Sequence, residues 1–342
     1  MSIENMGTIE RLVLATLGDD VARQTLDMLT IDAALLAQSG DTVSRAAFAM
    51  AMNVALFDDL LRRVPSGDAY VADTLARGGK VLFDHGALRS IRFPQGPTGA
   101  LPAGEEAFTR IFLPLGYEMA AIYPLERLKM TGRAYRHADF PEAIPQFFLS
   151  ELHVDRFDAE FADAAARIFG TSRDPLTDQA KAVLAHYAAG EPVSFADAAA
   201  ALPVILSAFD RQHEPASFED YQLLLSRSNE AAWIATEGNG FNHATDRVAD
   251  VAALAQRLKD EDRPMKEKLE ISATGRVRQT AFRADSVERP FADGEWRMVP
   301  GSFYEFISRD IDPDTGTLDL AFDTGNATGI FAMTSAQPGA AR

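Results

Sequence analysis

The chain has 342 residues, of which 47% are hydrophobic and 24% charged, a composition typical of a globular protein with a large core. Its formal net charge of −17 repels phosphate backbones and anionic lipids, so neither nucleic acids nor membranes are expected as partners. No stretch approaches the roughly 18 apolar residues of a membrane helix, and the N-terminus lacks the basic and apolar regions of a secretory signal, which favours a cytoplasmic protein.

Helical spacing of apolar residues dominates the first 79 residues, as at Ile9, Leu12 and Val13. The pattern then changes to runs of β-branched, aromatic and aliphatic residues that are typical of strands. Between residues 80 and 156 it predicts one helix, at 105–115, and four strands, at 80–93, 117–123, 129–136 and 146–152. This order is that of a βαβββ module.

Residues 157–236 return to helical spacing and are rich in alanine. Ser194 and Ser217 are each followed three residues later by an aspartate, a pattern that favours helix N-caps. From residue 237 the strand-rich pattern resumes, with a strand through His243, a helix at 251–259, and strands at 268–272, 277–283 and 302–308. The chain therefore divides into an N-terminal helical region, a first module, a helical insertion, a second module with a substrate segment, and a tail, at residues 1–79, 80–156, 157–236, 237–331 and 332–342.

The two strand-rich blocks contain an internal repeat. Each opens with His-x-x-x-Arg, which is His85 to Arg89 in the first block and His243 to Arg247 in the second. A glutamate follows in the last strand of each block, 66 residues after the first histidine and 62 after the second. A repeat of this length indicates a duplicated module, and we predict an α+β fold whose two modules form a central metal-binding cleft.

The repeat predicts a metal site. Two modules related by a local two-fold axis would direct His85 and His243 toward one point, and a glutamate on an adjacent strand would complete the ligand set. Two histidines and one carboxylate leave three positions of an octahedral metal open, the arrangement of oxygen-activating ferrous enzymes. Cysteine is absent, so only nitrogen and oxygen ligands are available. The repeat alone does not choose between Glu151 and Glu305.

Arg89 lies on the same strand face as His85, about 13 Å further along the strand. Its guanidinium could hold the carboxylate of a metal-bound substrate in a bidentate contact. For both Arg89 and Arg247 the alternative is a salt bridge to one of the 50 acidic residues. The remaining histidines have no duplicated context and are expected to be structural or exposed: His137, His153, His186 and His213.

At these residues the chain resembles the 2-oxoadipate dioxygenase/decarboxylases, a family of the vicinal oxygen chelate superfamily. The resemblance spans about residues 80–331 and rests on segments 84–89, 240–247, 268–272, 279–283 and 299–309. It implies a vicinal-oxygen-chelate-like fold with Fe(II) bound by His85, His243 and Glu305, and so favours Glu305 as the carboxylate. It also implies that Arg89 is the catalytic arginine that binds a substrate carboxylate.

The resemblance implies a substrate segment near the C-terminus, which begins here at Gly325 and Asn326, and Gln279 is expected on a strand that lines the cleft. The implied partners are O2 and a 2-oxo acid; 2-oxoadipate would give 2-hydroxyglutarate and CO2. The chain length of the acid and the oligomeric state stay open. Alternatives are an extradiol dioxygenase or a glyoxalase-like isomerase built on the same module, and a non-catalytic protein that binds a small ligand.

Overall fold

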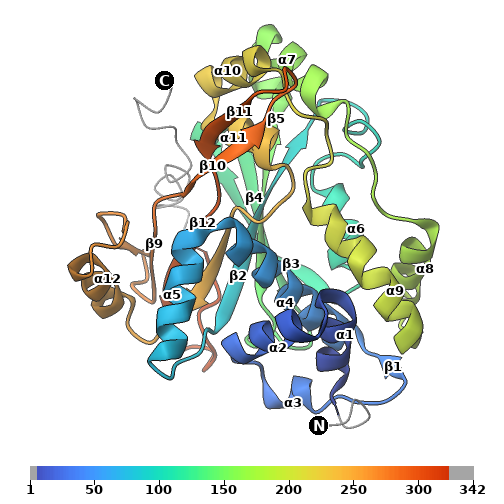
Figure 1. The fold of residues 1–342 in the computed structure, drawn as a ribbon, viewed down its shortest axis with the longest axis vertical. Coiled ribbons are helices and arrows are strands. Elements are labelled where there is room, and N and C mark those ends of the chain that lie inside the picture. Colours follow the sequence, from blue (N-terminus) through green and yellow to red (C-terminus); the bar gives the residue numbers. More distant parts are fainter. Residues whose placement is uncertain (1–5, 323–342) are drawn as a thin grey trace.

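The computed structural model describes residues 6–322 and shows an α+β fold, as predicted (Figure 1). An eight-stranded sheet, curled into a half-barrel, runs through the centre of the molecule. Helices surround it on several sides, and a separate two-stranded hairpin lies near one end. Within the described residues, no helix is both long and apolar enough to cross a lipid bilayer. The predicted division of the chain into five segments stays a prediction.

The N-terminal region is helical. Its helices are α1 (Thr8–Leu17), α2 (Asp19–Met28), α3 (Ala33–Leu36), α4 (Arg45–Arg63) and α5 (Pro65–Ala76). Helix α4 begins at its cap residue Ser44, whose hydroxyl accepts a hydrogen bond from the Ala47 amide. Most of α4 is buried, because its alanines and large apolar side chains face neighbours on nearly every side.

The first strand-rich block has the predicted order of one strand, one helix and three strands. These elements are β2 (Phe83–Arg92), α6 (Glu106–Phe112), β3 (Tyr117–Leu125), β4 (Met130–His137) and β5 (Gln146–His153). Both faces of β2 are buried almost throughout. It is therefore a central strand of the sheet.

The second block repeats this order with one addition. Its main elements are β7 (His243–Arg247), α12 (Val251–Asp260), β8 (Glu270–Ile271), β9 (Val277–Ala281) and β12 (Phe303–Arg309). A hairpin of β10 (Ser286–Pro290) and β11 (Trp296–Pro300) is inserted before β12. This hairpin was not predicted, because most of its strand residues are charged or exposed and, of these, only Val287 and Val299 pack on the core.

The strand order of the large sheet is β3-β4-β5-β2-β7-β12-β9-β8. In each half the first strand pairs in parallel with the last, β2 with β5 and β7 with β12. The two halves meet where β2 and β7 pair antiparallel. This arrangement brings the opening strands of the two blocks, with their histidines, side by side at the centre of the sheet.

The segment between the blocks is helical and contains α7 (Ala159–Phe169), α8 (Asp178–Ala188), α9 (Phe195–Leu206), α10 (Phe218–Arg227) and α11 (Asn229–Glu237). Ser194 and Ser217 cap α9 and α10, as predicted. The short strands β1 (Thr42–Val43) and β6 (Val193–Ser194) join the segment to the N-terminal region.

Two hydrophobic clusters pack against the sheet. The larger includes Leu88 and Phe147 together with helices of the N-terminal region. The smaller includes Ile91 and Leu152 together with side chains of α7, α10 and α11. Because alternate residues of a strand point to opposite faces, α7, α10 and α11 close one end of the sheet face that carries His85.

Candidate metal centre

His85 on β2, His243 on β7 and Glu305 on β12 meet in the middle of the sheet. The ligand atoms of the three side chains all lie within 4.8 Å of one another, and all three residues are buried. The Nε2 atoms of His85 and His243 each lie 3.2 Å from the Glu305 Oε2 atom. Among the residues that the structure describes, no other group of three such side chains has this spacing.

Strand register explains the meeting. Thr245 is the cross-strand partner of His85 on β2 and of Glu305 on β12, and His243 precedes it by two residues. All three side chains therefore project from the same face of three adjacent strands. Neighbouring strands of a sheet lie about 4.8 Å apart, so the side chains can meet. The Thr245 hydroxyl donates a 2.7 Å hydrogen bond to Glu305 Oε2 and lies 3.1 Å from His85 Nε2.

Asp84 fixes the orientation of the His85 ring, whose Nδ1 atom lies 2.8 Å from an Asp84 carboxylate oxygen. Consecutive residues of a regular strand point to opposite faces. Here the register of β2 with β7 shifts between Phe83 and His85, so Asp84 is the extra residue of a β-bulge. The bulge brings the carboxylate of Asp84 beside the His85 ring. The two-residue alternation of a regular strand would instead have predicted opposite faces for these two residues.

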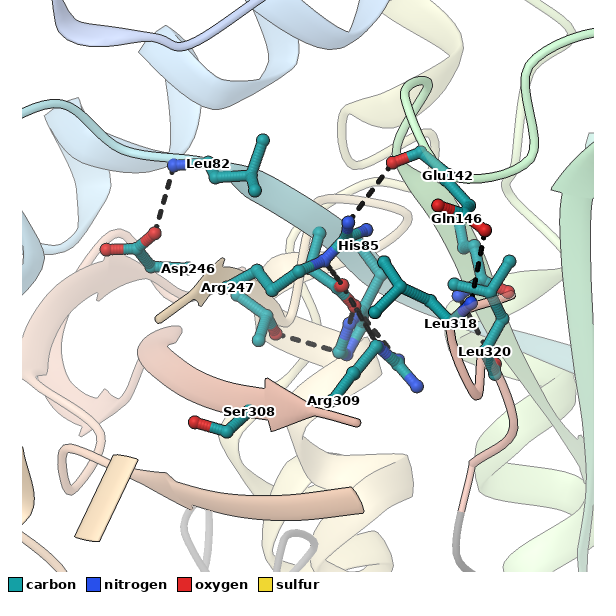
Figure 2. A network of polar contacts seen from close by, with 12 residues as sticks. Leu82, His85, Glu142, Gln146, Asp246, Arg247, Ser308, Arg309, Leu318 and Leu320 are labelled. Atoms are coloured by element: carbon teal, nitrogen blue, oxygen red, sulfur yellow. Dashed lines mark hydrogen bonds and ion pairs between the residues drawn. The ribbon is translucent and has the colours of Figure 1, made fainter. Parts of the chain in front are cut away.

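Two arginines hold Asp84 in turn. The Arg247 Nε atom donates a 2.6 Å hydrogen bond to Asp84, and Arg309, the last residue of β12, donates three of 2.9–3.1 Å from Nε and Nη2. Figure 2 shows Arg247 and Arg309 converging beside His85. Burial opposes the charge of Asp84, yet Arg309, His85 and Arg247 hold its pKa well below the ordinary range. The salt bridge to an acidic residue, which was the alternative role considered for Arg247, is therefore present in the structure.

The electrostatics of the three central residues are coupled. Burial opposes the charge of Glu305, but the adjacent imidazoles of His243 and His85 hold its pKa below the ordinary range. Burial also disfavours a charged His85, but hydrogen bonds to Asp84 and Glu305 outweigh it and raise the pKa. Burial lowers the pKa of His243, although the charge of Glu305 and its hydrogen bond act to raise this pKa. The second imidazole nitrogen of His243, Nδ1, lies 3.2 Å from the Asn242 side-chain oxygen.

The donor set fits a divalent metal ion. The second carboxylate oxygen of Glu305, Oε1, is buried and has no hydrogen-bond partner among the described residues. A buried carboxylate oxygen without a partner is costly in an apolar interior. Two imidazole nitrogens and one carboxylate on one side of a cavity are the ligands used for non-haem iron and related divalent metals.

Arg89 is fully buried at the same sheet face, four residues after His85 on β2. Its guanidinium carbon lies 4.9 Å from the centre of the Trp233 ring on α11, a cation–π contact. Burial lowers the pKa of Arg89 to about 10, against the opposing charge of Glu230, so the side chain stays protonated at neutral pH. Its charge is close enough to lower the pKa of His243.

Glu151 lies on the opposite face of the sheet. Its partner in the register is Ser90, whereas Arg89, on the face of His85, is paired with Ser150. The Glu151 carboxylate accepts hydrogen bonds from Arg92 Nε at 2.8 Å and Arg133 Nη1 at 3.3 Å. The structure therefore separates Glu151 from the two central histidines.

Gln279 is buried on β9 and donates a 3.1 Å hydrogen bond to Glu270. Its partner on β12 is Ile307, so it projects from the same face as Glu305, two residues earlier on that strand. Gly325 and Asn326 lie outside the described residues. The remaining histidines are bonded elsewhere: His137 to the amides of Asp139 and Phe140, His153 to Thr131, His186 to Glu191 and His213 to the carbonyl of Ala235.

Comparison with known proteins gives consistent matches. A family model described as 2-oxoadipate dioxygenase/decarboxylase matches residues 52–314. The chloroplastic 2-oxoadipate dioxygenase/decarboxylase of Arabidopsis thaliana is 24% identical over an alignment 291 residues long. The match covers 75% of this chain and 68% of the plant protein. A crystal structure from Ralstonia eutropha JMP134, of a protein assigned to the glyoxalase superfamily, is 49% identical with a TM-score of 0.88 over 93% of this chain and 99% of that one.

A second solved structure shares the fold at lower identity. Hydroxyglutarate synthase from Oryza sativa, in complex with 2-oxoadipate, is 20% identical and superposes with a TM-score of 0.67. The match covers 87% of this chain and 97% of the rice chain. The overall fold is therefore common to the bacterial and the plant proteins.

Proposed function

We propose that this chain, which belongs to the 2-oxoadipate dioxygenase/decarboxylase family, is an Fe(II)-dependent dioxygenase acting on a 2-oxo acid. The acid would react with one O2 to give one CO2 and a 2-hydroxy acid one carbon shorter. One observation supports the proposal most directly: two imidazoles and a single carboxylate are buried at one point of the sheet. One oxygen of that carboxylate, Glu305 Oε1, has no hydrogen-bond partner among the described residues.

His85, His243 and Glu305 would hold the metal, and bound Fe(II) would supply the reaction with O2. The surrounding residues prepare these ligands. The Asp84 carboxylate would accept a hydrogen bond from His85 Nδ1–H, which leaves the Nε2 lone pair directed at the centre. The hydroxyl of Thr245 holds one oxygen of Glu305, so the carboxylate has a fixed orientation before an ion arrives.

Arg89 would bind the carboxylate of the 2-oxo acid. A chain with a formal charge of −17 repels anions in general, so an anionic substrate needs a local cation. Arg89 supplies one in a buried setting, where the attraction between opposite charges is stronger than in water. Gln279, Gly325 and Asn326 are proposed to complete the substrate site. A cytoplasmic location, and a lack of nucleic-acid or membrane partners, stay predictions.

The match to a glyoxalase superfamily protein makes a metal-dependent isomerase the second candidate. Glu151 as a fourth protein ligand would favour that activity. Glu151 is instead bound to Arg92 and Arg133 on the other face of the sheet. Three ligands favour the dioxygenase, because they leave more of the metal open to small molecules.

The test is anaerobic loading with Fe(II), followed by measurement of O2 consumption and CO2 release over a series of 2-oxo acids of increasing length. We expect one substrate class to consume one O2 and release one CO2 per 2-hydroxy acid formed. Metal-free protein and a His243→Ala variant are the controls. An iron-retaining protein that consumes no O2 with any 2-oxo acid would refute the dioxygenase, and a protein that retains no divalent metal would point to a ligand-binding role.

A further inference from the structure

We propose that Arg309 is a positioning residue that couples the chain segment covering the metal centre to the orientation of His85. The covering segment is residues 318–322, which follow β12 and return across the sheet. The inference rests on the proposed metal site, but goes beyond it by assigning the segment and Arg309 a shared task. Its evidence is a continuous set of contacts from that segment to the His85 ring.

The covering segment belongs to the second half of the chain but packs on the first half of the sheet. The Phe322 ring stands edge-on to the His85 ring, with centroids 4.8 Å apart. The Phe322 amide donates to the Tyr123 hydroxyl at 3.0 Å, and the Leu320 carbonyl accepts from Gln146 at 3.3 Å. Figure 2 shows Leu318 and Leu320 beside Glu142 and Gln146. The segment thus crosses from β12 to β3 and β5 and covers one of the proposed ligands.

Arg309 binds the covering segment and Asp84 at the same time. Its Nη1 atom donates to the carbonyls of Asp319 and Ala321, both at 2.8 Å. Its Nε and Nη2 atoms donate to the Asp84 carboxylate. The guanidinium carbon also lies 5.3 Å from the centre of the Phe322 ring. One planar group with a fixed arrangement of donors therefore serves two partners, which a lysine ammonium cannot reproduce.

The position of Arg309 makes this coupling direct. It lies four residues after Glu305 on β12, on the same strand face, and its side chain is fully buried. If the covering segment leaves, Nη1 loses both carbonyl partners in a buried site, and Arg309 is no longer fixed against Asp84. Of the two arginines that bind Asp84 among the described residues, Arg247 alone would then hold the carboxylate that orients His85. Closure of the segment and alignment of the histidine are stabilised by the same side chain.

The experiment compares three variants: Arg309→Lys, Asp84→Asn and, as the matched control, Arg276→Lys. Arg276 binds the Asp319 side chain at 2.8 Å from a more exposed position, whereas Asp84 is bound by Arg247 and Arg309. Amide hydrogen exchange of residues 318–322 is measured in the metal-free proteins. The dissociation constant for Co(II), a spectroscopic substitute for Fe(II), is measured by anaerobic titration.

We expect Arg309→Lys to accelerate exchange in the covering segment and to weaken Co(II) binding by about 10–100-fold, the usual effect of losing an outer-shell partner. Arg276→Lys leaves the contacts of Arg309 with Asp84 and with the two carbonyls in place, so it should change both the exchange rate and the Co(II) dissociation constant much less than Arg309→Lys does. Asp84→Asn should weaken Co(II) binding and also accelerate exchange in the covering segment. That last effect carries the test, because a purely local role for Asp84 would leave the segment unchanged.

Two outcomes overturn the inference in protein that is folded by circular dichroism. One is unchanged exchange at residues 318–322 in Asp84→Asn, and the other is wild-type Co(II) affinity in Arg309→Lys. If the wild-type chain itself binds no divalent ion, the proposed function fails. The exchange comparison still decides the coupling in that case, because it uses metal-free protein.

Discussion

The two halves of the central sheet are built alike but contribute differently to the metal centre. Each half presents one histidine from its opening strand, His85 or His243. Two residues beyond the level of that histidine, the closing strand of the second half carries Glu305 and that of the first half carries Phe148. Phe148 packs on Phe322 with ring centroids 4.9 Å apart. The strand arrangement is thus matched between the two halves, while one carboxylate and one apolar ring make the site one-sided.

The two arginines of the His-x-x-x-Arg motifs also differ in their contacts. Arg247, four residues after its histidine, is bound to Asp84 and so supports the His85 ligand of the other half. Arg89 occupies the equivalent place in the first half and stacks on Trp233 of α11, in the helical segment between the two blocks. This segment therefore distinguishes the two arginines. One is a structural partner of a ligand, and the other is a buried cation that we assign to substrate.

The largest expected effect separates the two glutamates of the repeat. Glu305→Ala should lower affinity for Fe(II) or Co(II) by more than about 100-fold, since loss of an outer-shell partner alone costs 10–100-fold. Glu151→Gln should keep metal affinity, but should lower the free energy of unfolding by up to about 3 kcal/mol, because Arg92 and Arg133 lose a buried partner. Metal titration and urea unfolding of both variants give the result. Loss of metal binding in folded Glu151→Gln would contradict the assignment.

The next comparison concerns the two arginines. Arg89→Lys should raise KM for the 2-oxo acid and lower kcat/KM by about 30–100-fold, because a bidentate contact worth about 2–3 kcal/mol is lost. Arg247→Lys should leave KM nearly unchanged and weaken metal binding instead, through Asp84. Steady-state kinetics at saturating metal, together with metal titration, separates these effects. Equal changes of KM in both variants would show that the two positions are not functionally distinct.

Much of the fold followed from sequence pattern. The paired His-x-x-x-Arg motifs and the strand runs predicted the two blocks, and both capping serines were placed correctly. The hairpin of β10 and β11 was missed, because a ribbon whose strands place only two apolar side chains on the core gives too weak a strand pattern. The repeat alone left Glu151 and Glu305 as equal candidates. Spacing along the chain was similar, but strand register puts the two carboxylates on opposite faces.

The residues around the metal centre were predicted unevenly. Thr245 and Arg309 follow the proposed ligands His243 and Glu305 by two and four residues on the same strands, so the two-residue period could have identified them. Asp84 could not be found in this way, because its position depends on a bulge that breaks the period. Trp233 reaches Arg89 only through the packing of α11, which no local pattern specifies.

An effect of similar size is expected on the opposite face of the sheet, three residues after each histidine, where the first half has Leu88 and the second has Asp246. Asp246 is buried and accepts hydrogen bonds from the Tyr70 hydroxyl at 2.8 Å and the Leu82 amide at 3.0 Å. Burial raises the pKa of Asp246 to about 6. An acid whose pKa is raised on folding stabilises the native state fully below its unfolded pKa of about 4, and this contribution is lost as pH rises through 6.

Asp246→Asn should remove this pH dependence. Relative to the variant, the wild-type free energy of unfolding should fall by about 2–3 kcal/mol between pH 4 and pH 7. Urea unfolding of metal-free protein across that range measures the difference between the two curves. Parallel curves would mean that Asp246 has the same pKa in the folded and unfolded protein, because its hydrogen bonds with Tyr70 and Leu82 compensate for its burial.

The smallest expected effect lies immediately after the two histidines, where Gly86 and Ala244 are cross-strand partners. A Cβ atom added at Gly86 would lie 2.4 Å from a ring carbon of Phe241, whereas Ala244 already has its methyl group in a fully buried site. Gly86→Ala should therefore cost about 1–2 kcal/mol by overpacking, and Ala244→Gly about 1 kcal/mol through chain entropy and lost packing. Combining Gly86→Ala with Phe241→Leu should recover part of the loss in urea unfolding. If Gly86→Ala alone is neutral, the Phe241 ring moves freely, and close packing at this position does not distinguish the two halves of the sheet.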